Sequence, residues 1–143
     1  MGQLPSYWKS VNLGDPKLAD FFRGSILQIE EKIDGSQFSF GRVNGQLHMR
    51  SRSTELNLEA PEKLFSKSVN HLLSLNQDLI PDNVVFRGES VTSVRHNSNV
   101  YGRTPSGYIV LFGAEDLVTG RCFSHLELSD WANVFGIDVV PLL

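Results

Sequence analysis

Apolar and polar residues alternate along residues 36–43 (SQFSFGRV) and again along residues 46–52 (QLHMRSR). A period of two is typical of a half-buried β-strand, because successive side chains of a strand point to opposite faces. The pair Asn44-Gly45 separates the two runs, and both residues tolerate the positive φ that a two-residue turn requires. The pattern therefore predicts a β-hairpin over residues 36–52.

Four further segments have strand character. Each is a short run rich in Val, Ile, Leu or Phe, bounded by polar residues, Gly or Pro, as expected for a strand that is largely buried. They are residues 25–32 (SILQIEEK), 84–91 (VVFRGESV), 108–112 (YIVLF) and 137–143 (IDVVPLL). Residues 92–107 are predicted to form a polar loop between the second and the third of them.

The best helical pattern covers residues 61–77 (PEKLFSKSVNHLLSLNQ), where Pro61 suits the first turn. Residues recur along it at helical spacing and form a stripe that is predicted to face the core, namely Leu64, Phe65, Val69, Leu72, Leu73 and Asn76. His71 lies beside this stripe and is expected at the boundary of the core rather than in a ligand site.

Two shorter helices are indicated by their capping residues. Asp15 suits the N-cap of a helix over residues 15–24 (DPKLADFFRG). Ser124 and Glu127 have the spacing of a capping box before a helix that continues over residues 128–136 (LSDWANVFG). Together with the strands, these helices predict an α+β fold with a largely antiparallel or mixed sheet and flanking helices.

Length and composition restrict the class of protein. With 143 residues, the chain is long enough for one domain with a core and too short for two, so residues 1–143 are predicted to form a single domain. No run of about 18 apolar residues is present, and no membrane partner is expected. The net charge of −3 argues against indiscriminate binding of nucleic acid by the whole surface.

The only cysteine, Cys122, excludes an internal disulfide and favours a reducing compartment. No second cysteine accompanies a pair of histidines, so no zinc site is predicted and no residue is assigned as a metal ligand. Trp8, Trp131 and Cys122 are expected to pack against other residues rather than to form a site. Arg95, His96 and Arg103 lie in the predicted loop, where they either contact an RNA backbone or are solvated, so none is assigned to a site.

A candidate site begins at Lys32, which ends the predicted strand over residues 25–32 and precedes Asp34-Gly35. A lysine amine at this place is either a solvated charge at a bend or a nucleophile, and Gly35 permits a close approach of the backbone to a phosphate. Arg52, Glu89 and Phe112 lie at or near the ends of later strands. A cation, a carboxylate and an aromatic ring are the groups that hold phosphate, ribose and base, which favours the nucleophile.

These segments resemble the covalent nucleotidyltransferases, which comprise ATP-dependent RNA and DNA ligases and mRNA capping enzymes. EKIDG resembles motif I of that superfamily, RSR motif Ia, FRGE motif III and YIVLF motif IIIa. The block RHNSNVYGRTPSGYIVLF is more similar to RNA ligases, of the type related to bacteriophage T4 RNA ligase 2, than to DNA ligases. The resemblance covers residues 25–143 and implies part of a nucleotidyltransferase domain of the ATP-grasp-like adenylylation kind.

The resemblance implies a role for each matching residue. Lys32 would attack the α-phosphate of ATP and carry AMP, which would pass to an RNA 5′-phosphate before a 3′-hydroxyl displaces it. The cofactors implied are ATP and Mg²⁺, and the partner is RNA with 5′-phosphate and 3′-hydroxyl ends. The remaining nucleotide-binding residues are Glu31 and Ile33 beside the lysine, Gly35 in the turn, Arg52 for ribose or phosphate, Glu89 for ribose and Phe112 for adenine.

The chain departs from the family pattern at two places. The motif IIIa aromatic is usually followed by aspartate in RNA ligases, whereas Phe112 is followed by Gly113, so either Glu115 or Asp116 takes that role or the role is lost. Motifs IV and V, which carry further lysines, have no counterpart, and the chain contains no lysine after Lys67. We therefore expect the N-terminal part of a nucleotidyltransferase domain that needs a C-terminal segment of the same domain and is weakly active or inactive alone.

Three functions remain open from the residues. The leading one is an ATP-dependent RNA ligase in the cytoplasm of a bacterial or phage-infected cell. A DNA ligase or a capping-type enzyme is an alternative, because Lys-x-Asp-Gly is common to all three classes. A non-catalytic remnant that binds a nucleotide or RNA is the alternative outside enzymes.

Overall fold

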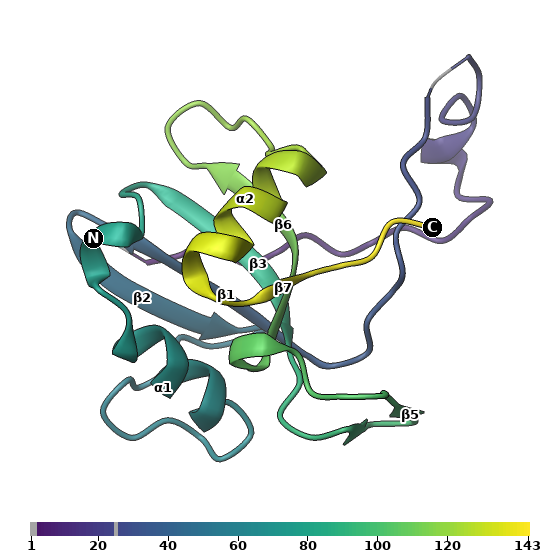
Figure 1. The fold of residues 1–143 in the computed structure, drawn as a ribbon. Helices are drawn as coiled ribbons and strands as arrows, with labels where there is room; N and C mark the ends of the chain where they lie inside the picture. The colour runs from purple at the N-terminus through teal and green to yellow at the C-terminus, as the bar shows by residue number, and fades with distance from the viewer. Residues whose placement is uncertain (1–2, 25) are drawn as a thin grey trace.

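The computed structural model describes residues 3–24 and 26–143, and a mixed five-stranded sheet lies at its centre (Figure 1). The strand order is β2-β1-β3-β6-β7. Neighbouring strands are antiparallel except for the last pair, β6 and β7, which is parallel. The bounds are β1 Ser36–Val43, β2 Gln46–Ser51, β3 Val84–Ser90, β6 Ile109–Asp116 and β7 Asp138–Val139. The α+β class and the mixed sheet are therefore confirmed.

The predicted hairpin is present. β1 and β2 pair from Val43 opposite Gln46, and the turn residues Asn44 and Gly45 have φ of 52° and 75°. Both angles lie in the left-handed region, which asparagine and glycine adopt at little cost. The two turn residues thus set the register of the strands that follow.

Two α-helices, α1 (Ser66–Ser74) and α2 (His125–Phe135), contribute to one core on the same face of the sheet. Its aromatic centre comes from four fully buried rings, Phe38 and Phe40 of β1, Phe86 of β3 and Phe135 of α2. The Phe86 and Phe135 rings meet edge to face at 4.9 Å, a favoured geometry for aromatic pairs. This face of the sheet is therefore filled by side chains.

The capping box of α2 is confirmed. The Ser124 hydroxyl accepts from the Glu127 N–H, the Glu127 carboxylate accepts from the Ser124 N–H, and Gly136 ends the helix at φ 64°. Trp131 of this helix stacks on Phe135 at 5.4 Å, so its packing role is also confirmed. Cys122, expected to pack, is exposed, because it lies in the segment after β6 rather than under a helix.

The other two predicted helices are shorter than their sequence patterns. α1 begins at Ser66 rather than at residue 61, since its N-cap Phe65 offers no capping side chain, and Asn76 caps the following 3-10 helix η2 (Gln77–Leu79) instead. Of the predicted stripe, Leu64 and Leu73 are 44% and 43% exposed. The segment at residues 15–24 contains only the 3-10 helix η1 (Pro16–Leu18), capped by Asp15 as predicted.

The predicted strand at residues 137–143 is present but shorter, as β7 (Asp138–Val139), whereas the predicted strand at residues 25–32 is wrong. Residue 25 lies outside the described residues, and residues 26–32 run extended, with the isolated bridge of Glu30 to Leu142 as their contact of β type. The sheet ends at β2 on one side and at β7 on the other, and this segment pairs with neither strand. Residues 141–143 instead run beside residues 29–31.

The predicted loop over residues 92–107 contains a small hairpin of β4 (Arg95–His96) and β5 (Asn99–Val100), and the 3-10 helix η3 (Ser106–Tyr108) follows it. Arg103 pairs with Asp138 at 2.8 Å. His96 is buried rather than solvated, because it packs against the turn that precedes β1. Among the described residues, neither α1 nor α2 has the length and apolarity to cross a membrane.

Candidate nucleotide-binding site

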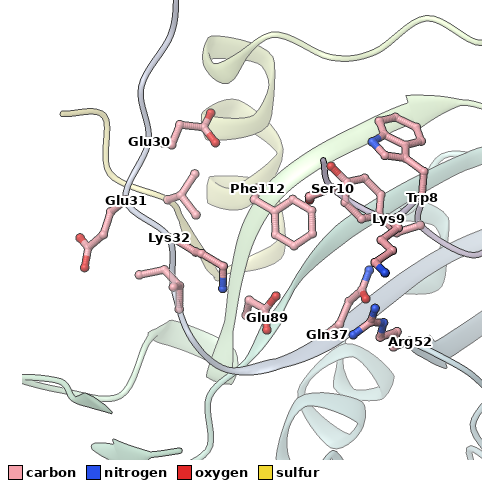
Figure 2. A pocket seen from close by; sticks show the side chains of 13 residues that line it. Trp8, Lys9, Ser10, Glu30, Glu31, Lys32, Gln37, Arg52, Glu89 and Phe112 are labelled. Carbon is pink, nitrogen blue, oxygen red and sulfur yellow. The ribbon is translucent and has the colours of Figure 1, made fainter. Parts of the chain in front are cut away.

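The face of the sheet opposite the helices is polar. Because side chains alternate along a strand, burying Phe38 and Phe86 in the core directs Gln37 of β1 and Glu89 of β3 to the other face. A cavity of about 520 Å³ lies against this second face. Its lining residues are Tyr7, Trp8, Lys9, Ser10, Glu30, Glu31, Lys32, Ile33, Gln37, Arg52, Glu89, Phe112 and Val140 (Figure 2).

A β-bulge presents Phe112 to this cavity. Along β3 and β6, Arg87 pairs with Gly113 and Gly88 with Leu111, so Phe112 is the extra residue between them. A bulge bends the strand and changes the direction of a side chain. Gly88 opposite the bulge has no room for a side chain, since a Cβ there would lie 2.4 Å from the Val110 carbonyl oxygen. The ring of Phe112 is thus directed into the cavity by the backbone around it.

Lys32 lies in the extended segment that leads to β1, and its side chain is exposed to the cavity. Figure 2 shows its amine directed toward the carboxyl group of Glu89. Burial raises the pKa of Glu89 to about 7, and the positive charge of Lys32 and the backbone N–H of Gly35 oppose that rise only in part. A lysine amine and a carboxyl group that titrates near neutral pH therefore face each other.

The β4–β5 hairpin holds the turn after Lys32 in place. The N–H of Asp34 donates to the Tyr101 hydroxyl at 2.7 Å, and the Asn97 amide donates to the Gly35 carbonyl oxygen at 3.1 Å. Ser36 Oγ and His96 Nε2 lie 3.2 Å apart, within hydrogen-bond distance. Asp34, Gly35 and the first residue of β1, Ser36, are thus bonded to the β4–β5 hairpin and to Tyr101, which directly follows it.

Gly35 is required by the packing of this turn on β3. A Cβ at this position would lie 2.8 Å from the Ser90 carbonyl oxygen and 2.9 Å from Glu89 Cβ. Gly35 itself does not line the cavity. Its close approach is therefore to the strand that carries Glu89, and not to the space where a ligand would lie.

The comparisons with known proteins decide the family. The profile of the RNA ligase family matches residues 25–143. The chain belongs to the RNA ligase family. A comparison with curated proteins found no match.

Solved structures of Naegleria gruberi RNA ligase have the same fold. Three of them are a mutant with AMP and Mn (TM-score 0.62, 18% identity), the ligase with PPi (0.60, 18%) and a mutant with ATP and Mn (0.59, 17%). In each case the match covers 81% of this chain and 35% of the Naegleria chain. The chain thus spans about a third of the length of these structures.

Six of the seven residues predicted from the RNA ligase motifs line the cavity. They are Glu31, Lys32, Ile33, Arg52, Glu89 and Phe112, and only Gly35 does not. The backbone N–H of Glu31 donates to the Pro141 carbonyl oxygen at 3.0 Å, and Figure 2 shows its carboxylate pointing away from the cavity. Any contact of Glu31 with a base would therefore use its carbonyl oxygen. Arg52 follows β2 and is exposed at the edge of the cavity.

The two acidic residues considered as substitutes for the RNA ligase aspartate have other contacts. Glu115 pairs with the buried Arg87 at 3.6 Å and lines a separate cavity of about 210 Å³. Asp116 accepts from the N–H groups of Val118 and Thr119 and so caps the turn after β6. Neither residue lines the larger cavity.

Sequence reasoning missed the N-terminal wall of the cavity, formed by Tyr7, Trp8, Lys9 and Ser10. Trp8 was expected to pack, and it stacks on Tyr7 at 4.7 Å, but it is 58% exposed and belongs to the lining of the cavity. No motif marks these residues, and they precede the part of the chain that the RNA ligase profile matches. The alternation of polar and apolar residues along β1 could have identified Gln37 as a cavity residue, because it places that side chain on the face of the sheet opposite to the buried phenylalanines.

A metal ion at this cavity would need oxygen ligands beyond the carboxyl groups that line it. Mg²⁺ is usually held by one or two carboxylates together with substrate phosphates. Glu89 supplies a carboxyl group inside the cavity, with Glu30 at its edge. No group of three or more potential metal-binding side chains occurs within residues 3–24 and 26–143.

Proposed function

We propose that this chain carries the adenylylation step of an ATP-dependent RNA ligase, with Lys32 as the nucleophile. The observation that supports it is the meeting of Lys32, Glu89 and Phe112 in one cavity. All three residues lie in the part of the chain that the RNA ligase profile matches. The ring would stack on adenine and the carboxylate would accept from the ribose hydroxyls.

In the proposed step, neutral Lys32 Nζ attacks the α-phosphorus of ATP. The bond from that phosphorus to the bridging oxygen of the β-phosphate breaks, pyrophosphate leaves, and the amine loses a proton. The product is AMP joined to Nζ as a phosphoramidate. Cations around the phosphates offset the charge that builds up on the leaving group, an effect that is commonly worth about 10²–10³ in rate for one such group.

AMP would then pass to the 5′-phosphate of an RNA end. An oxygen of that phosphate attacks the AMP phosphorus, and the bond to Lys32 Nζ breaks. A 3′-hydroxyl next attacks the 5′-phosphorus, AMP leaves, and a phosphodiester bond joins the two RNA ends. A contribution to sealing from a further segment of the same domain stays a prediction.

The decisive experiment is the intact mass of the protein after incubation with ATP and Mg²⁺. The wild type should gain the mass of one AMP group, and Lys32→Ala should gain none. Lys63→Ala is the matched control, because Lys63 is exposed outside the cavity. An adduct on Lys32→Ala would contradict the assignment. ATP binding without any adduct would favour either a nucleotide-binding protein that does no chemistry or a step that depends on a further segment of the same domain.

Two further measurements separate the enzyme classes. Incubation with GTP instead of ATP distinguishes a capping-type enzyme, which would form a GMP adduct. Transfer of AMP to a nicked RNA duplex, compared with a nicked DNA duplex, distinguishes the two kinds of ligase. Preference for DNA in this assay would overturn the RNA part of the proposal and leave the role of Lys32 intact.

A further inference from the structure

The N-terminal segment of residues 3–10 is bound to the polar face of the sheet by two arginines. Arg50 of β2 donates from Nη1 to the Leu4 carbonyl oxygen, and Arg87 of β3 donates to the Pro5 carbonyl oxygen at 3.2 Å. The Leu4 side chain is only 2% exposed. Arg87 is itself buried, so its bond to the segment is shielded from solvent. We call residues 3–10 the N-terminal strap.

The strap also contacts the aromatic residue of the cavity. The Tyr7 ring meets Phe112 edge to face at 5.3 Å and stacks with Trp8 at 4.7 Å. The Arg87 guanidinium lies over the ring of Tyr7, 5.3 Å from its centre. These contacts set the position of the strap beside Phe112, and they direct the next residue, Lys9, into the cavity.

Lys9 and Lys32 approach the cavity from different sides. Figure 2 shows the Lys9 side chain directed toward Gln37 and Arg52, on the side of Glu89 opposite to Lys32. In a phosphoryl-transfer step the nucleophile and the leaving group lie roughly in line, on opposite sides of the phosphorus. If Lys32 attacks the α-phosphorus, the leaving pyrophosphate therefore points toward Lys9 and Arg52.

We propose that Lys9 of the N-terminal strap, together with Arg52, binds the β- and γ-phosphates of the nucleoside triphosphate. The inference rests on the proposed function, because it takes Lys32 as the attacking group. A lysine ammonium offers three donors and a compact charge, which suits phosphate oxygens. The strap would thus make the site selective for triphosphate over monophosphate, although it lies outside the part matched by the RNA ligase profile.

The first test compares the affinity of Lys9→Ala for two ligands by calorimetry. The ligands are AMP and the α,β-methylene analogue of ATP, which cannot lose pyrophosphate. Lys9→Ala should lower the affinity for the analogue about tenfold, as expected for the loss of a hydrogen bond to a charged group. Its affinity for AMP should stay within about twofold of that of the wild type. Lys9→Arg should restore most of the affinity, and Lys63→Ala should match the wild type for both ligands.

The outcomes separate this inference from the proposed function. An equal loss of affinity for AMP and for the analogue, or no loss for either, would show that Lys9 does not bind the outer phosphates. The proposed role of Lys32 as nucleophile would still stand. If the wild type bound neither ligand, the cavity would not be a nucleotide site and both proposals would fail. An adduct forming at the wild-type rate on Lys9→Ala at limiting ATP would also contradict the inference.

The second test uses Trp8 as a reporter of the strap. In Trp131→Phe, Trp8 is the remaining tryptophan, and it faces the cavity. Addition of the ATP analogue should change the emission of Trp8 at concentrations that match the calorimetric affinity. Unchanged emission at saturation would contradict the placement of the strap beside the nucleotide.

Discussion

The backbone N–H of Asp34 donates a 2.7 Å hydrogen bond to the hydroxyl of Tyr101, which lies 67 residues further along the chain. Asp34 is two residues after Lys32, so this bond restrains the backbone that carries the lysine. The Asn97 amide adds a second bond to the same turn, at the Gly35 carbonyl oxygen. The β4–β5 hairpin is therefore part of the support of the site, although neither Tyr101 nor Asn97 lines its cavity.

Removing the Tyr101 hydroxyl should slow the formation of the AMP adduct. Tyr101→Phe loses one hydrogen bond, worth about 0.5–1.5 kcal/mol, which corresponds to a rate reduced roughly two- to tenfold if the bond positions Lys32. The reduction should appear in the rate at saturating ATP rather than in ATP affinity. Tyr108→Phe is the control, because that tyrosine lies beside α1 near Lys67. Equal rates for Tyr101→Phe and the wild type would show that the hairpin does not position the lysine.

Glu89→Gln should change how stability depends on pH. The folded-state pKa of Glu89 is about 7 against an ordinary value of 4.5, so between these values the folded chain holds a proton that the unfolded chain releases. The free energy of unfolding therefore falls as pH rises through this range, and the stabilising effect of the protonated group is lost above about pH 7.

In urea unfolding, the wild type should lose more stability between pH 5 and pH 7.5 than Glu89→Gln does. Glu59→Gln, which removes an exposed carboxylate, is the matched control and should behave as the wild type. Parallel pH profiles for the wild type and Glu89→Gln would contradict the raised pKa of Glu89.

Replacing Phe112 should weaken the binding of adenine nucleotides. Stacking of a base on an aromatic side chain is worth about 1–3 kcal/mol by alanine substitution, so Phe112→Ala should lower ATP affinity roughly 5- to 150-fold. Phe112→Tyr keeps the ring and should retain most of the affinity. Adenosine alone should show the same loss of affinity as ATP in a binding assay, because the proposed contact of the ring is with the base. A loss seen for ATP and not for adenosine would place the aromatic contact elsewhere.

Gly35→Ala should destabilise the fold and slow adduct formation together. The added Cβ would lie 2.8 Å from the Ser90 carbonyl oxygen, too close without a shift of the turn or of β3. Such overpacking typically costs about 1–3 kcal/mol, which thermal unfolding would detect. Gly102→Ala is the control, since a Cβ there meets no atom within 4 Å. An unchanged melting temperature for Gly35→Ala would mean that the turn adapts freely.

The order of the motifs was predictable from the sequence. So were the turns and helix ends that depend on residues close together in the chain. Asn44-Gly45 sets a two-residue turn, and Ser124 with Glu127 caps α2, because each signal depends on residues within four positions of one another. The four motifs identified the RNA ligase family, and six of the seven residues predicted from them line one cavity.

Contacts between distant segments were decided by the tertiary structure alone. Residues 26–32 have strand-like composition but join no strand of the sheet, and their contact of β type is the bridge from Glu30 to the distant Leu142. Lys9 and Trp8 reach the cavity because Arg50 and Arg87, far along the chain, bind the carbonyl groups of the strap. Sequence patterns report local geometry and the side on which a residue is buried. The partner of a backbone group 46 or 82 residues away depends instead on how the whole sheet packs.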